Sequence, residues 1–173
     1  MRHLHILCEG QTEEILVQDV LKPHFVGVDT RVTYSIIATN RPHGSPYDRV
    51  RHVESALAET IGHRRFLPNL VLHEAEAWVL ADCRRLGEVM GDPGPAAELE
   101  RIVQVEPSPE LINDGVDTAP SKRIKNAYPQ YEKTLDGPLV IADAGLDAIR
   151  SRCPHADDWL REIEARMSQS VTQ

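Results

Sequence analysis

The sequence predicts an α/β fold, in which a small parallel sheet is flanked by helices and followed by a helical C-terminal part. Three short, mostly apolar stretches, at residues 3–8, 31–38 and 66–72, are typical of buried strands. Stretches with the apolar spacing of amphipathic helices separate them. Strands that are joined through a crossover helix run parallel, so we expect the three strands to share one parallel sheet.

The first strand, at residues 3–8, ends at Glu9 and Gly10, where glycine permits a tight turn. A helix is expected next, because Glu13 and Glu14 favour the positive end of a helix dipole and apolar residues then recur at helical spacing. These apolar residues are Val17, Val20, Leu21 and Phe25. Pro23 marks either the end of this helix or a late kink.

The second strand, at residues 31–38, is followed by a polar turn and by an amphipathic helix at 47–61. Gly62 is a natural C-cap for that helix. The third strand, at 66–72, leads directly into the sequence His73-Glu74-Ala75-Glu76-Ala77-Trp78.

The second half of the chain has the pattern of short helices. We expect a helix at 95–103, a loop at 105–120 and then helices interrupted by proline and glycine. The last of them begins at Pro154 and ends near Met167. At 173 residues the chain suits a single domain over 1–173, with an α/β part at 1–82 and a mostly helical part at 83–168.

The cysteine pattern, hydropathy and net charge exclude several classes of protein. Cys8, Cys83 and Cys153 lie far apart and form no Cys-x-x-Cys pair, so we expect a reducing, cytoplasmic location and neither a disulfide framework nor a zinc knuckle. No apolar run approaches the length of a membrane span, and no membrane partner is expected. The net charge of −8 does not attract polyphosphate. A nucleic-acid substrate would therefore need a local basic patch, a metal ion or a partner protein.

Acidic residues follow the first and third predicted strands. The carboxyl ends of parallel neighbouring strands meet at one edge of a sheet, so Glu9 is expected near Glu74 and Glu76. Clustered carboxylates repel one another unless one is protonated or a cation binds. Oxygen ligands of this kind suit Mg²⁺ or Mn²⁺, with Ca²⁺ as a further candidate. The alternative is a strand end with solvated acids.

A basic cluster lies further along the chain. Lys122, Arg123 and Lys125 follow Pro120 and Ser121, and Ser121 is suited to capping a helix. Such a cluster could contact phosphate or stabilise developing negative charge. A solvated helix face is an equally good explanation. The scattered histidines show no metal-ligand spacing and are interpreted as surface or packing residues.

Four longer motifs keep the order found in one known family. They are Cys8-Glu9-Gly10-Gln11-Thr12-Glu13-Glu14; Arg65-Phe66-Leu67-Pro68 with Leu72-His73-Glu74-Ala75-Glu76-Ala77; Pro120-Ser121-Lys122-Arg123-Ile124; and Asp136-Gly137-Pro138-Leu139 with Cys153-Pro154-His155. Over most of its length the chain thereby resembles the bacterial domain-of-unknown-function family 4276. That family is TOPRIM-like and related to the TOPRIM part of OLD-type nucleases.

The resemblance implies roles for individual residues. Glu9 matches the glutamate that acts as catalytic acid or base, or at the metal site, in TOPRIM proteins. Glu76 is the better match for the acid of the third-strand motif, and Glu74 is the second. Lys122 matches, more weakly, a lysine used near the site in related nucleases. Genes of the family often lie beside ATPase genes in phage-defence or restriction-like neighbourhoods, which implies an ATPase partner.

One departure from the family leaves alternatives open. Members of the family usually carry a further strand with an aspartate before the helix at Tyr47, whereas Thr39 to Pro46 holds no acid here. The site could then hold a single metal, take a ligand from a partner or be inactive. The expected function is a metal-dependent phosphodiesterase or nuclease; the alternatives are a non-catalytic regulatory subunit and a small-molecule phosphotransfer enzyme.

Overall fold

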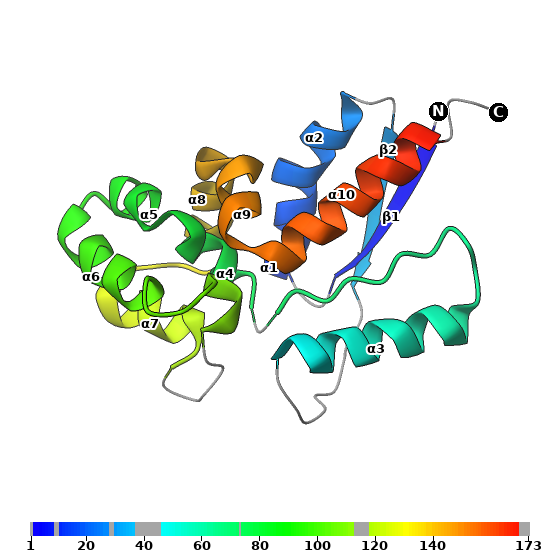
Figure 1. Cartoon of the computed structure of the whole chain (residues 1–173). Helices are drawn as coiled ribbons and strands as arrows, with labels where there is room; N and C mark the ends of the chain where they lie inside the picture. The colour runs from blue at the N-terminus through cyan, green and yellow to red at the C-terminus, as the bar shows by residue number, and fades with distance from the viewer. Residues whose placement is uncertain are drawn as a thin grey trace.

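The computed structural model describes residues 2–8, 11–27, 30–36, 46–72, 74–112 and 118–169. Over these residues it is a mostly helical α/β structure with a small parallel sheet of two strands near the N-terminus (Figure 1). In chain order the elements are β1 (Arg2–Cys8), α1 (Gln11–Leu16), η1 (Val17–Leu21), α2 (Lys22–Val26), β2 (Thr30–Ile36), α3 (Pro46–Ile61), α4 (Glu76–Val79), η2 (Leu80–Asp82), α5 (Cys83–Met90), α6 (Pro93–Val103), η3 (Pro109–Leu111), α7 (Pro120–Ala127), α8 (Asp136–Ala144), α9 (Leu146–Arg152) and α10 (Pro154–Gln169).

The first two predicted strands and their parallel pairing are confirmed. β1 and β2 pair with Leu4 opposite Val32. Side chains alternate between the two faces of a strand, and Val32 is accordingly buried while its neighbour Arg31 is exposed. The buried face packs against α10 through Leu160 and Ile163, and Figure 1 shows α10 running alongside both strands.

The predicted third strand at 66–72 was wrong, because the structure has no strand there. Pro68 lacks the N–H that a strand would donate to a ladder. The neighbouring backbone groups bond instead to side chains of helices: the N–H of Leu70 donates to Oε1 of Glu54 at 2.8 Å, and the carbonyl of Phe66 accepts from Arg166 at 3.2 Å. This segment therefore reaches Glu74 as irregular backbone.

The helix expected after the first strand is present as three successive segments, α1, η1 and α2. η1 is a π-helical turn, in which the N–H of Lys22 donates to the carbonyl of Val17. Pro23 follows at once in α2, and because η1 precedes it without a break, its missing N–H removes one backbone bond from this continuous helical stretch. Pro23 thus interrupts the α-helical bonding pattern, and the chain stays helical to Val26.

α3 is confirmed over 46–61 and ends at Gly62, as predicted. Gly62 has a positive φ of 56°, which glycine adopts without steric cost, and its N–H donates to the carbonyl of Ala58 at 2.9 Å. None of the side chains of α3 is buried. The helix therefore adds little to the core.

The expected run of C-terminal helices is also confirmed. Their buried side chains form the main hydrophobic cluster, which includes Trp78, Leu86, Ile124, Ile141 and Ile149. A second cluster lies between the sheet, the first helical segments and α10. Among the described residues, no helix has both the length and the apolar character needed to cross a membrane.

Candidate functional site

Glu74 and Glu76 lie on a turn that leads into α4. The N–H of Glu74 donates to the carbonyl of Leu72 at 2.8 Å, and the carbonyl of Glu74 accepts from Ala77 at 3.0 Å. Glu76 is the first residue of α4, and its side chain is 0% exposed. The side chain of Glu74 is 21% exposed. The turn thus places one carboxylate inside the protein and another at its edge.

A lysine joins the two carboxylates. Nζ of Lys133 lies 3.4 Å from Oε1 of Glu74 and 3.1 Å from Oε2 of Glu76. The side chain of Lys133 is 45% exposed, so it lies between the buried acid and solvent. One ammonium group therefore faces two carboxylates, which leaves an excess of negative charge when both are ionised.

Glu74 is fixed by the first turn of α7. Its Oε2 accepts from the backbone N–H of Ser121 at 2.9 Å, and its Oε1 accepts from the Ser121 hydroxyl at 3.0 Å. Burial disfavours the charged form, but the Ser121 hydrogen bonds and Lys133 together outweigh it and lower the pKa of Glu74. Glu74 is thus held ionised at the N-terminal end of α7.

Glu76 has the opposite environment. Burial raises the pKa of Glu76, and the nearby charge of Lys133 only partly opposes that rise. Among the described residues, neither oxygen of Glu76 receives a well-directed hydrogen bond, although Lys133 is within ion-pair distance of Oε2. A fully buried carboxylate with this little compensation is costly to keep charged.

A third polar group is enclosed beside the acids. Within the described part of the chain, the hydroxyl of Tyr131 is buried and meets no hydrogen-bond partner. Burial raises the pKa of Tyr131, and the charges of Glu76, Asp136 and Glu74 raise it further. A Cβ atom on Gly137 would lie 2.8 Å from this hydroxyl. Glycine at position 137 therefore makes room for the Tyr131 ring.

The turn that carries Tyr131 and Lys133 is held at both ends. Nζ of Lys125 donates to the carbonyl of Tyr131 at 2.6 Å. Oδ2 of Asp136 accepts from the N–H of Glu132 at 2.7 Å, and the N–H of Asp136 returns a bond to the Glu132 carbonyl at the same distance. The backbone below Lys133 is consequently well fixed.

The predicted site residues have different outcomes. Glu74 and Glu76 both lie beside Lys133. The expected approach of either acid to Glu9 stays a prediction, and the third strand on which the shared sheet edge was based is absent from the described residues. Glu9 lies outside the described residues, as does the acid-free stretch from Thr39 to Pro46 except for Pro46 itself. Lys122 has an exposed side chain on α7, next to Ser121, and its role stays a prediction. Lys133 was missed, because it belongs to no motif and lies 59 positions from Glu74 in the sequence.

The described residues contain no group of three or more histidine, cysteine, aspartate or glutamate side chains that could hold a metal ion. Glu74 and Glu76 are a pair, and Glu9 is the predicted third member. The pair nonetheless fits a hard cation, because the buried oxygens of Glu76 have few donors to bind in its place.

Cys83 and Cys153 are buried free thiols.

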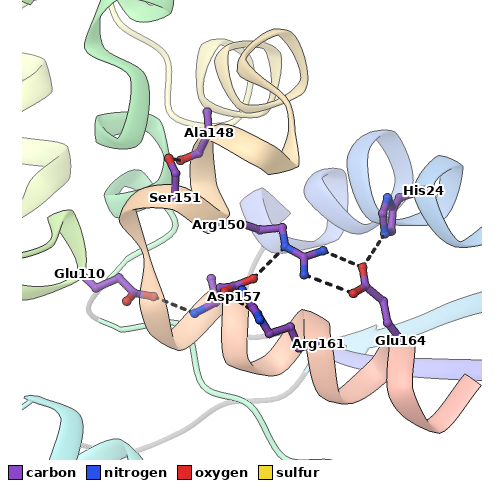
Figure 2. A network of polar contacts seen from close by, with 9 residues as sticks. His24, Glu110, Ala148, Arg150, Ser151, Asp157, Arg161 and Glu164 are labelled. Carbon is purple, nitrogen blue, oxygen red and sulfur yellow. Dashed lines mark hydrogen bonds and ion pairs between the residues drawn. The ribbon is translucent and has the colours of Figure 1, made fainter.

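Two other polar clusters tie the helices together. Figure 2 shows Arg150 of α9 between two acids of α10: its Nε donates to Asp157 at 2.8 Å and its Nη1 to Glu164 at 2.6 Å, while His24 approaches Glu164 from α2. Glu110, 1% exposed, accepts the N–H groups of His155 and Ala156 at the start of α10. Both clusters join α10 to neighbouring elements and act as structural supports.

Comparison with known proteins gives one match. The family model described as domain of unknown function DUF4276 matches residues 28–164. No curated protein matches the chain at a significant level, and no solved structure does. The matched region contains Glu74, Glu76, Ser121, Tyr131 and Lys133, and it covers most of the sequence. The chain therefore belongs to the DUF4276 family.

Proposed function

We propose that this protein is a metal-dependent phosphodiesterase of the nuclease type, with Glu74 and Glu76 as metal ligands and Mg²⁺ or Mn²⁺ as the cation. The observation that carries the proposal is the buried Glu76 carboxylate, whose oxygens have no well-directed donor within the described part of the chain and which faces a second carboxylate across one lysine. A divalent cation would neutralise the excess charge, and carboxylate oxygens are its preferred ligands.

Each residue has a stated task in this proposal. Glu76 and Glu74 hold the cation, and Glu9 is the proposed third ligand and acid or base, from its place in the family motif. When bound, the cation supplies an activated water and neutralises the scissile phosphate. Lys133 and the exposed Lys122 balance negative charge on the substrate. The TOPRIM-like relation, a cytoplasmic location and a role beside an ATPase in phage defence belong to the same proposal.

A specific observation favours a second candidate, a non-catalytic subunit that regulates a partner. Lys133 already supplies positive charge to both acids, and the described residues contain no third ligand. In this candidate Lys133 alone offsets the negative charge of the two acids, and no metal takes part. In that case the Glu74–Lys133–Glu76 group would serve only to hold α4, α7 and the turn at 128–135 together.

Metal-dependent stabilisation separates the two candidates. A ligand present at about 100 times its Kd, and bound only by the folded state, adds about 2.7 kcal/mol. For a protein of this size that corresponds to a rise in Tm of roughly 5–10 °C. We expect Mn²⁺ to produce such a rise in the wild type and a much smaller one in Glu76→Gln, measured by scanning fluorimetry against a chelator blank.

Glu106→Gln is the matched control, because Glu106 is an exposed acid and its replacement changes the net charge equally. It should keep the full Mn²⁺ response. An equal rise in the wild type and Glu76→Gln would place the metal elsewhere. No rise in any of the three proteins would favour the regulatory subunit.

A further inference from the structure

Lys133 is the basic group that faces both Glu74 and Glu76. Its Nζ lies 3.1 Å from Glu76 and 3.4 Å from Glu74, which is where a cation shared by the two acids would sit. Glu76 is fully enclosed, whereas the Lys133 side chain is 45% exposed. The ammonium group therefore offsets part of the negative charge of both acids from the solvent side of Glu76.

The Lys133 side chain can change its conformation although the backbone of its turn is fixed. Lys125 and Asp136 hold the turn on either side of Lys133 through its main chain. The lysine side chain has several rotatable bonds and already reaches solvent along part of its length. Turning it outward would need no rearrangement of the turn and would withdraw the ammonium group from both carboxylates together.

We propose that Lys133 is an internal competitor for the divalent cation: it closes the Glu74–Glu76 site at rest and turns out to solvent when a cation binds. This inference rests on the proposed function and adds its regulation. The released ammonium is then placed at the rim of the site, where it can pair with a phosphate group. Metal affinity is thereby lowered by the free energy of the ion pairs that must break.

Replacing Lys133 by methionine tests the competition directly. We expect Lys133→Met to bind Mn²⁺ about tenfold more tightly than the wild type or better, because close charges interact strongly at partly buried sites. Free Mn²⁺ measured by electron paramagnetic resonance gives the Kd without any need for catalysis. Lys22→Met is the matched control, since Lys22 is an exposed lysine on α2, and it should bind as the wild type does.

Removing Lys133 leaves Glu76 without the ammonium group that faces it. Lys133→Gln is therefore measured in parallel as a polar replacement. Far-ultraviolet circular dichroism checks that each variant folds. Equal or weaker Mn²⁺ binding by both folded Lys133 variants would overturn the competitor role and leave the metal site standing. Absence of Mn²⁺ binding in the wild type and in every variant would instead reject the proposed function. Mn²⁺ binding by the Lys133 variants together with no detectable binding by the wild type would support the competitor role most strongly.

Discussion

Glu74 and Glu76 carry the same carboxylate two positions apart, and their surroundings move the two pKa values in opposite directions. Ser121 and Lys133 lower the pKa of Glu74, whereas burial raises that of Glu76. Paired groups whose environments push their pKa values apart are common at sites that handle protons or cations. The difference comes from the fuller burial of Glu76 and from the Ser121 hydrogen bonds to Glu74, which no local sequence pattern reveals.

The space around the Tyr131 hydroxyl gives a prediction at the scale of one atom. Gly137→Ala would place its Cβ 2.8 Å from that hydroxyl, so we expect a loss of about 1–3 kcal/mol from overpacking. Tyr131→Phe removes the contacting atom and a buried hydroxyl that has no partner among the described residues, and it should be neutral or slightly stabilising.

The double variant tests the cause. In the Tyr131→Phe background, Gly137→Ala should lose most of its effect on the free energy of unfolding, measured with urea in the presence of a chelator. Additive effects of the two substitutions would mean that the alanine disturbs α8 in some other way.

Local patterns predicted the site only in part. Glu74 and Glu76 stood out because they follow an apolar stretch and precede Trp78. Ser121 stood out as a suitable helix cap, but that role was wrong, because the N-cap of α7 is Ala119 and the Ser121 hydroxyl bonds to Glu74. Lys133 had no comparable signal: it lies in a turn between α7 and α8, and its distance from Glu74 in the sequence hides a contact made only by the folded chain.

At the scale of the element, helices were easier to predict than the sheet. Apolar spacing is a property of the helix alone, and it located α3, α6 and α10 within a few residues. A strand exists only where a neighbour completes its hydrogen bonds. Residues 66–72 are mostly apolar, but Pro68 has no N–H to donate to a neighbouring strand. The backbone groups of Leu70 and Phe66 bond to the side chains of Glu54 and Arg166 instead of to a strand.

The attachment of α3 depends on polar contacts and should vary with pH. Tyr47 donates to Glu110 at 3.2 Å, and Nε2 of His155 lies 3.1 Å from Oε1 of Glu54. Burial opposes the charge on His155, but Glu54 and Glu110 outweigh it and raise the pKa of His155.

The sign of the pH effect follows from that shift. A histidine with a raised pKa in the folded state adds stability below its unfolded pKa, about 6.5, and loses it as pH rises through the folded value. We expect amide hydrogens of 46–61, corrected for intrinsic exchange, to be better protected near pH 6 than near pH 8.5. The difference should vanish in His155→Gln.

His52→Gln is the control, because His52 is an exposed histidine on α3 itself. It should keep the pH dependence of the wild type. Protection of α3 that is independent of pH, or that His52→Gln abolishes, would show that the His155–Glu54 pair does not attach the helix.

At the scale of the whole molecule, the negative net charge of the protein repels a polyanionic substrate. The chain carries 27 acidic and 19 basic residues, for a net charge of −8. Lys122, Arg123 and Lys125 are concentrated on α7, whose first turn holds Glu74, but Arg123 donates to the carbonyl of Thr118 and Lys125 to that of Tyr131. Lys122 and Lys125 are both exposed, but Lys122 is the one whose side chain makes no hydrogen bond within the described residues, which leaves it available to a phosphate. Binding by the chain alone is therefore expected to be weak and strongly dependent on salt.

Cleavage by the whole protein should reflect both the acids and the missing positive charge. We expect slow, Mn²⁺-dependent cleavage of nucleic acid by the isolated chain, stimulated when the protein encoded beside it is added, because a partner can supply the basic surface and any ligand that 39–46 does not provide. Glu9→Gln and Glu76→Gln should each abolish it, Lys122→Ala should weaken it mainly at higher salt, and Glu106→Gln should leave it unchanged. Cleavage is measured by gel electrophoresis, and cleavage that persists in both Glu9→Gln and Glu76→Gln would place the active site elsewhere. The absence of cleavage in Mn²⁺ and in Mg²⁺, with and without the partner, would favour the regulatory subunit.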